Sequence, residues 1–507
     1  MQLHEWQKEC LSMWASNSYR GIVNAVTGSG KTVLALTATQ HLEMIADREL
    51  RIKIVVPQNF LAAQWKDEIK RQLGAKTTDI GIYGGKRKDL GRKYMIYIIN
   101  SARYCLARHI LSDIKNGHSV MLIADECHHY GSAENNRIFD FYKIMDKNAP
   151  YYALGLSATP EIVNYKAITV PLGREIYCYD LGRALRDRII SRFILYSINL
   201  EFTENEHAEY ESLSFSLSKC LGLLYDAYPE LKSMPSGVFF AYLQKLTQQG
   251  CEEAQAALTL MYRRRALCHM AAERPVCAVS VVKALPEHTR VILFCERIQA
   301  AEQLYSSLLE HFPNQVGLYH SKMADNTRQD MLERYKHGVM RLLICCKALD
   351  EGLNIPSTDA GIIVSSTMSA RQRVQRLGRM LRHSKEIKRI YYLYIGGSSE
   401  DSELVIGLRT LENNIPFIAL RYSNGSFIHN EYERLRRNVL EHVSNHRYDQ
   451  KMLEALDQNI DRALLRGDFL LSETACRENL QMARTKTERN YWASVLYIIH
   501  ARLGKLL

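Results

Sequence analysis

The sequence predicts an α/β protein with two parallel-sheet domains, a helical connector between them and a helical region after the second. Two stretches alternate short apolar runs with segments of helical periodicity, the pattern of parallel strands linked by helices. Between these stretches, and again after the second, apolar residues recur at helical spacing. We therefore expect domains at 1–195 and 286–400, a connector at 196–285 and an accessory region at 401–507.

The apolar runs give the expected strands. They lie at 21–26, 52–57, 94–99, 120–124 and 151–156 in the first domain, and at 291–295, 315–319, 341–345, 361–365 and 390–395 in the second. These runs are apolar throughout instead of alternating, so helices should cover both faces of each sheet.

Length and composition describe an ordinary globular protein that favours an anionic partner. A chain of 507 residues is long enough for about three or four domains. Its formal net charge of +11 favours a polyanion such as nucleic acid, although many basic proteins have only a well-solvated surface. The twelve cysteines are scattered without metal-site spacing, and the sequence contains neither a signal-peptide pattern nor a membrane-length apolar run. We expect a soluble, cytoplasmic protein.

A phosphate-binding loop follows the first expected strand. Residues 25–32 read AVTGSGKT and lead into a run of good helix formers. Backbone N–H groups at a glycine-bearing turn and a helix N-terminus bind phosphate oxygens. Lys31 is expected to reach the β- and γ-phosphates, and the Thr32 hydroxyl to ligate Mg²⁺. The expected nucleotide-binding residues of the loop are Thr27, Gly28, Ser29, Gly30, Lys31 and Thr32.

Two acids follow the fourth expected strand at the point where it ends. Asp125 and Glu126 come directly after an apolar run, and the carboxyl edge of a parallel sheet is where such folds carry their chemistry. We expect Asp125 to hold Mg²⁺ through water and Glu126 to orient and polarise the attacking water. After the fifth strand, the hydroxyls of Ser157 and Thr159 are placed to bond to the acids and to sense the γ-phosphate.

Three further features gain meaning from this loop. Gln7, in an expected helix about two dozen residues before Lys31, is either a reader of the adenine edge or a surface glutamine. In the second domain, Arg376, Arg379 and Arg382 recur at helical spacing and form either a basic surface helix or the source of the arginine finger that the first domain lacks. The phosphate-binding loop in the first domain favours the finger. In the connector, the triplet 263–265 is either a phosphate contact or a solvated helix face.

Taken in order, these motifs resemble those of the superfamily 2 helicases and translocases, and most closely the XPB-like and type III restriction-subunit-like branch. The resemblance covers residues 1–200 and 286–400. It rests on Gln7, the loop 25–32, Val56-Pro57 with Gln64-Trp65, Asp125-Glu126-Cys127-His128, Ser157-Ala158-Thr159 and the run 375–382.

The resemblance implies two RecA-like lobes that hold ATP and Mg²⁺ between them. It implies that Lys31 and Thr32 bind the nucleotide with its metal, that Asp125 and Glu126 drive hydrolysis, and that Arg379 and Arg382 act as fingers from the other lobe. It also implies that Gln7, Gly352 and Gln375 belong to the nucleotide site. It further implies that Ser157 and Thr159 couple the nucleotide state to lobe movement and that Asn354 links nucleic acid to the ATP cleft. Asn354 stands where aspartate is commoner, and 345–347 read Cys-Cys-Lys where a threonine is usual.

The predicted function is a nucleic-acid-stimulated ATPase, a DNA helicase or translocase in repair, restriction or antiviral defence. DNA is favoured over RNA because the first lobe resembles the restriction subunits and because Gln375 stands where DEAD-box RNA proteins typically have histidine. Two alternatives stay open: an ATP-gated clamp or scaffold that recruits an effector such as a nuclease, and an RNA helicase. A protein partner would dock on the helical connector or the C-terminal region, and no membrane partner is expected.

The finger assignment predicts that Arg382→Ala lowers ATP turnover far more than ATP affinity. Such arginines stabilise charge that develops in the transition state, and their loss commonly costs about three to five decades in rate. Steady-state kinetics combined with equilibrium nucleotide binding measure the two effects separately. Wild-type turnover in Arg382→Ala would contradict the assignment.

Overall fold

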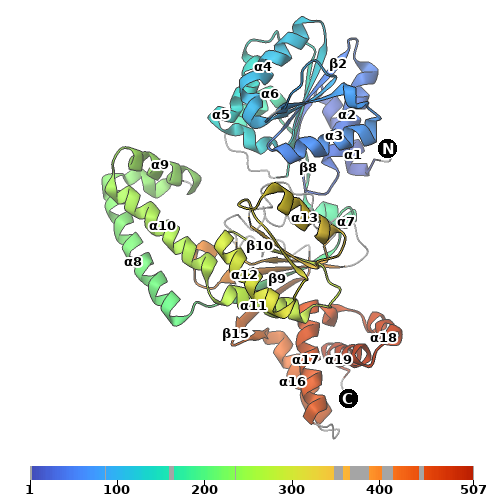
Figure 1. Cartoon of the computed structure of the whole chain (residues 1–507), viewed down its shortest axis with the longest axis vertical. Coiled ribbons are helices and arrows are strands. Elements are labelled where there is room, and N and C mark those ends of the chain that lie inside the picture. Colours follow the sequence, from blue (N-terminus) through green and yellow to red (C-terminus); the bar gives the residue numbers. More distant parts are fainter. Residues whose placement is uncertain are drawn as a thin grey trace. The chain divides into compact units, whose positions relative to one another are not determined.

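The structure is a computed structural model of the 507-residue chain. It describes residues 3–85, 87–158, 165–234, 236–346, 358–365, 387–401, 415–444 and 450–505. The chain divides into two compact units, and the division falls between Arg192 and Phe193. Figure 1 shows the helices and strands of the chain with their labels. No helix among the described residues is long and apolar enough to cross a membrane.

The first unit is built on an eight-stranded sheet of order β4-β3-β5-β2-β6-β7-β1-β8. All neighbouring strands are parallel except the β3–β4 pair at one edge. The strands are β1 (Arg20–Ala25), β2 (Leu50–Val56), β3 (Ile80–Gly84), β4 (Arg87–Lys88), β5 (Tyr94–Ile98), β6 (Ser119–Ala124), β7 (Tyr151–Ser157) and β8 (Glu175–Tyr179).

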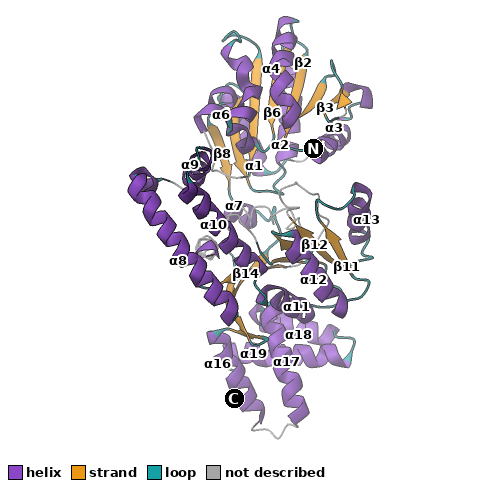
Figure 2. Cartoon of the chain, turned by 60° about the vertical axis from the view of Figure 1, so that its left-hand side comes forward, coloured by secondary structure: helices purple, strands orange, loops and turns teal. Residues whose placement is uncertain are grey.

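Helices cover both faces of this sheet (Figure 2). One face packs against α1 (Glu5–Ser16), α2 (Lys31–Ile45), α3 (Asn59–Leu73) and α7 (Leu181–Arg186). The other packs against α4 (Ile99–Lys115) and α6 (Tyr165–Leu172), with the short α5 (Ala133–Asn136) beside α4. Successive β1 residues therefore enter different cores: Val23 faces the α1 side and Ile22 the α4 side. Burial on both faces explains the continuous apolar runs.

The second unit holds another eight-stranded sheet, of order β11-β12-β10-β13-β14-β9-β15-β16. Its strands are parallel except for the final β15–β16 hairpin. They are β9 (Phe193–Leu200), β10 (Val291–Cys295), β11 (Val316–Tyr319), β12 (Leu342–Cys346), β13 (Ala360–Ile363), β14 (Lys388–Ile395), β15 (Phe417–Ser423) and β16 (Ser426–Ile428).

The helices of the second unit form three groups. An arm of α8 (Glu204–Ala227), α9 (Ser236–Gln248) and α10 (Glu252–Met270) has a small apolar core of its own. Next to the sheet lie α11 (Glu273–Ala284), α12 (Ile298–His311) and α13 (Asp325–Lys336). The C-terminal group is α16 (Asn430–Ser444), α17 (Gln450–Arg466), α18 (Glu473–Met482) and α19 (Lys486–Arg502), of which α16, α17 and α19 add residues to the core of the unit.

The predicted fold class is confirmed: all ten expected strands are present, and the connector is helical. The structure differs from the expected boundaries at two places. The apolar run 193–200, which spans the expected boundary at 195, is strand β9 and lies between β14 and β15 of the second sheet. The region 401–507, expected to be helical, begins in its described part with β15 and β16 and joins the same core.

Gly173 links α6 to β8 where the chain passes close to the start of β1. Its φ is +97°, and a Cβ there would lie 2.9 Å from the carbonyl carbon of Arg20 and from the nitrogen of Gly21. Gly117, after α4, has a φ of +87° with no atom within 4 Å of its Cβ position. Alanine substitutions at the two glycines therefore measure two free-energy costs: that of the left-handed backbone alone at Gly117, and that of the backbone together with a clash at Gly173.

We expect Gly117→Ala to lower the free energy of unfolding by about 1–2 kcal/mol, the cost of a left-handed alanine. Gly173→Ala should cost about 1–3 kcal/mol more, because backbone atoms cannot give way as a side-chain end can. Denaturant unfolding of the full chain, read as the first transition, measures both. Equal losses in the two variants would show that the approach to Arg20 does not constrain the fold.

Candidate active site

The loop after β1 forms a cradle of backbone N–H groups at the carboxyl edge of the first sheet. Gly28 and Gly30 have φ values of +83° and +94°, which side-chain-bearing residues rarely adopt. Gly30 caps α2, and the first turn of α2 carries no acidic residue. The orphan N–H groups and the positive end of the helix dipole therefore meet no carboxylate from within that turn, which suits a phosphate group.

Lys31 and Gln7 both bond to backbone carbonyls of the loop. The ammonium of Lys31 donates to the carbonyl of Ala25 across the loop at 2.8 Å. Gln7 is buried, and its amide donates to the carbonyl of Gly30 at 3.0 Å and accepts from the N–H of His4 at 2.9 Å. Gln7 therefore fastens the start of α1 to the phosphate loop. Its predicted role in reading adenine stays a prediction.

The hydrogen-bond partners of the loop hydroxyls indicate whether the cradle fits a triphosphate. Ser29 is satisfied internally, since its hydroxyl donates to the carbonyl of Val26 at 2.7 Å. Thr27 is buried, and its hydroxyl has no hydrogen-bond partner within the described part of the chain. A buried polar atom without a partner is costly. This hydroxyl and the left-handed glycines fit an anionic ligand in the loop.

Asp125 follows β6 and is held from three sides. The indole N–H of Trp65, on α3, donates to its carboxylate at 2.8 Å. The N–H of Glu126 donates to the other carboxylate oxygen at 3.1 Å. The hydroxyl of Tyr130 donates to its backbone carbonyl at 2.7 Å. The first two bonds fix the carboxylate in one orientation, as a metal ligand requires, and the third holds the backbone of Asp125.

Glu126 has a strained backbone, and its side chain lies near a histidine. Its φ of +49° is left-handed, a conformation that costs a residue with a side chain about 1–2 kcal/mol. Strain of this kind persists where the surrounding structure fixes it and is concentrated at functional sites. The Nδ1 atom of His128 lies 3.6 Å from the Glu126 carboxylate and 3.1 Å from the hydroxyl of Ser157, at the end of β7. His128 therefore connects the acid to the next strand.

The pKa of the Cys127 thiol depends on burial and on the charges around the site. Burial raises the pKa of Cys127 well above its usual range, and the charges of Glu126 and Asp125 raise it further. The charge of Lys31 acts in the opposite direction, lowering that pKa. The cation of the phosphate loop and the two acids therefore influence the same buried atom, which fits the order β6-β7-β1 in the sheet.

The structure describes ten of the sixteen residues that the sequence places in the site. They lie at the carboxyl ends of β1, β6 and β7, with Gln7 joined to the loop from α1; they are Gln7, Thr27, Gly28, Ser29, Gly30, Lys31, Thr32, Asp125, Glu126 and Ser157. Six lie outside the described residues: Thr159, Gly352, Asn354, Gln375, Arg379 and Arg382. The individual roles of all sixteen stay predictions.

The sequence did not predict the roles of three residues at this site. Trp65 was noted only within a motif, although its indole orients the Asp125 carboxylate from 60 positions away. His128 belongs to the run 125–128, and its position beside Glu126 was the available signal. For Tyr130 no local pattern points to a bond with the carbonyl of Asp125.

Two family models match this chain. The model described as the type III restriction enzyme res subunit matches residues 1–162, and the helicase conserved C-terminal domain matches residues 277–384. A DNA 3'-5' translocase, XPB2, of Sulfurisphaera tokodaii is 26% identical over 75% of this chain and 79% of its own length. A putative DNA 3'-5' helicase, Rad25, of Haloarcula marismortui is 22% identical over 79% of this chain. The match spans only 54% of that relative.

Solved structures share the fold. The helicase MrfA bound to DNA aligns with a TM-score of 0.55 at 12% identity, over 83% of this chain and 50% of its own. The S. cerevisiae protein Dbp5 bound to RNA aligns with a TM-score of 0.50 at 11% identity, over 82% and 89%. At these identities the likeness concerns the fold, which is a pair of RecA-like domains.

The indole bond to Asp125 predicts a specific defect in Trp65→Phe. We expect kcat for ATP to fall about tenfold, since a hydrogen bond to a charged group contributes about 1.5–3 kcal/mol and a tenfold change in rate is ~1.4 kcal/mol. Trp14→Phe is the matched control, because Trp14 is equally buried and its indole donates to the carbonyl of Ala153 at 2.9 Å, near the opposite end of β7. Steady-state kinetics and thermal unfolding should give both variants similar stabilities but only Trp65→Phe a reduced kcat. A shared loss of kcat would assign the effect to packing.

Proposed function

We propose that this chain, a superfamily 2 helicase of the XPB-like branch, is an ATP-driven motor that translocates along or unwinds DNA. The observation that carries the proposal is the carboxyl edge of the first sheet. There the glycine cradle and Lys31 follow β1 and the pair Asp125-Glu126 follows β6, with β7 between the two strands. A phosphate cradle alone fits many nucleotide-binding proteins. A cradle together with an oriented carboxylate and a second acid on a strained backbone fits a protein that hydrolyses the nucleotide.

The residues divide the work of hydrolysis. Lys31 and the N–H groups of the loop hold the phosphates, and the Thr27 hydroxyl gains a hydrogen-bond partner there. Thr32 and Asp125 would hold Mg²⁺, which supplies positive charge that offsets the charge of the phosphates. Glu126 orients a water and accepts its proton, and His128 and Ser157 keep the Glu126 side chain in place.

DNA is the favoured track. Two relatives are named as a DNA 3'-5' translocase and a putative DNA 3'-5' helicase, which supports DNA. A third, from Methanocaldococcus jannaschii, is named as a putative ATP-dependent RNA helicase and is 23% identical over 74% of this chain, which keeps RNA as the second candidate. The net charge of +11 suits either polyanion.

We place the motor in the cytoplasm, in DNA repair, restriction or antiviral defence. The XPB-like relatives support repair, and the match of residues 1–162 to the res subunit of type III restriction enzymes supports the other two settings. A protein partner would bind the arm or the C-terminal helices.

ATP hydrolysis measured with no nucleic acid, single-stranded DNA, duplex DNA and RNA at one low salt concentration tests the proposal. We expect DNA to raise kcat about tenfold or more, equivalent to ~1.4 kcal/mol. The stimulation should weaken as salt rises, because binding through phosphates releases counterions. Lys31→Ala should abolish hydrolysis with an unchanged circular dichroism spectrum, whereas Lys115→Ala, at the exposed end of α4, should behave as wild type. Equal rates under all four conditions would contradict a motor and favour the ATP-gated clamp.

A further inference from the structure

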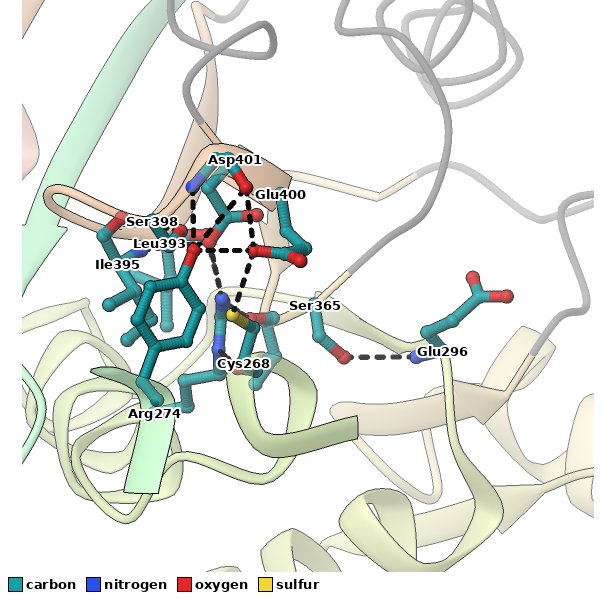
Figure 3. A network of polar contacts seen from close by, with 12 residues as sticks. Cys268, Arg274, Glu296, Ser365, Leu393, Ile395, Ser398, Glu400 and Asp401 are labelled. Carbon is teal, nitrogen blue, oxygen red and sulfur yellow. Dashed lines mark hydrogen bonds and ion pairs between the residues drawn. The ribbon is translucent and has the colours of Figure 1, made fainter. Parts of the chain in front are cut away.

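A turn after β14 buries two consecutive acids whose carboxylates bond to different parts of the second unit. Figure 3 shows Glu400 and Asp401 side by side above the ends of the strands. The carboxylate of Asp401 accepts from the N–H of Ile395 at 2.8 Å and pairs with the guanidinium of Arg274 at 2.6 Å. Both side chains of the Arg274–Asp401 pair are almost completely buried, so its geometry is tightly constrained.

Arg274 uses its remaining donors to hold three separate backbone segments. Its Nε donates to the carbonyl of Cys268, in the last turn of α10, at 2.6 Å. Its Nη1 donates to the carbonyl of Leu393 in β14 at 3.0 Å and to that of Val364, just after β13. One side chain therefore fixes the end of the arm against the carboxyl ends of two neighbouring strands (Figure 3).

Glu400 joins the same turn to the body of the arm. Its carboxylate accepts from the Nε of Arg264, on α10, at 2.6 Å, and from the hydroxyl of Tyr210, on α8, at 2.8 Å. Arg264 also donates to the hydroxyl of Ser399. A displacement of α8 or α10 therefore pulls directly on the residue that precedes Asp401.

The three arginines of the connector triplet 263–265 have different surroundings. The side chain of Arg264 is only 17% exposed and its partner Glu400 only 10%. Arg263 is 62% exposed and lies 3.9 Å from an exposed carboxylate of Glu209, while Arg265 lies over the ring of Phe240. Neither a uniformly solvated face nor a uniform phosphate contact describes the triplet.

We propose that the arm controls nucleic-acid-stimulated ATP turnover through the Arg264–Glu400 ion pair, with Arg264 as a positioning residue. The inference rests on the proposed function of the chain. The described contacts run from the arm to the exit of β13: Arg264 holds Glu400, the next residue Asp401 holds Arg274, and Arg274 holds the carbonyl of Val364. The chain from Val364 to the start of β14 contains Gln375, Arg379 and Arg382, which the motif resemblance assigns to ATP hydrolysis.

Further bonds at the ends of the strands give the link a rigid base. The hydroxyl of Ser365 accepts from the N–H of Glu296, which ties the exit of β13 to the residue after β10. The hydroxyl of Ser398 donates to the carbonyl of Ile395 at 3.0 Å and closes the turn (Figure 3). A displacement of the arm therefore moves a turn whose shape these hydrogen bonds hold.

The test is a double-mutant cycle with Arg264→Ala, Glu400→Gln and the double variant of the full chain. Basal kcat, kcat at a saturating concentration of the stimulating DNA, and KM for ATP are measured for each. We expect the stimulated kcat to fall about tenfold in each single variant, within the usual range of coupling between sites, with basal kcat and KM unchanged. The double variant should lose no more than either single variant, because both remove one interaction.

Arg263→Ala is the matched control, since it removes a neighbouring, exposed arginine from the same helix. It should keep full stimulation. The inference is overturned if Arg264→Ala behaves like Arg263→Ala, if basal and stimulated rates fall by the same factor, or if the losses of the two single variants add. A wild-type chain that no nucleic acid stimulates would contradict the proposed function itself. Normal stimulation of both wild type and Arg264→Ala would contradict only the role of the ion pair.

Discussion

The adjacency of β6, β7 and β1 in the first sheet is the constraint on which the candidate site depends. Parallel strands deliver their carboxyl ends to one edge, so the loop with Lys31, the acids after β6 and Ser157 meet there although they are far apart in the chain. The apolar burial of both faces stabilises the sheet that holds them together. The chemistry at the edge is therefore supported by cores that contain none of the reacting groups.

The two units use buried polar groups in different ways. In the first, polar bonds orient single side chains at the edge of the sheet, as Trp65 does for Asp125. In the second, Arg274 and Asp401 connect whole segments that differ widely in sequence position. Truncating either partner of such a buried pair leaves the other charge without compensation, which is costly. A side chain of that kind is retained where the relative position of the segments matters.

The local pattern predicted ten strands because a strand that is buried on both faces is a continuous run of apolar residues, which is visible in the sequence. It did not predict the other six described strands, among them β3, whose run IGIYG is interrupted by glycine, and β9, which follows the apolar pair 189–190 without a turn signal. The phosphate loop and the acid pair were recognisable because their residues are consecutive. The bond from Trp65 to Asp125 and the burial of Arg264 depend on tertiary position, which neighbours in sequence do not specify.

The placement of β9 has a consequence for how the chain reaches its native state. Its partner β14 lies roughly 200 residues downstream, so their pairing closes a very long loop at an entropic cost. During synthesis the residues up to 192 can complete the first sheet while β9 still lacks one neighbour on each side, β14 and β15. Until they emerge, β9 is an apolar strand with two open edges, the kind of segment that chaperones shield and that aggregates in their absence. The order of strands in the second sheet thus makes the maturation of this protein depend on its C-terminal third.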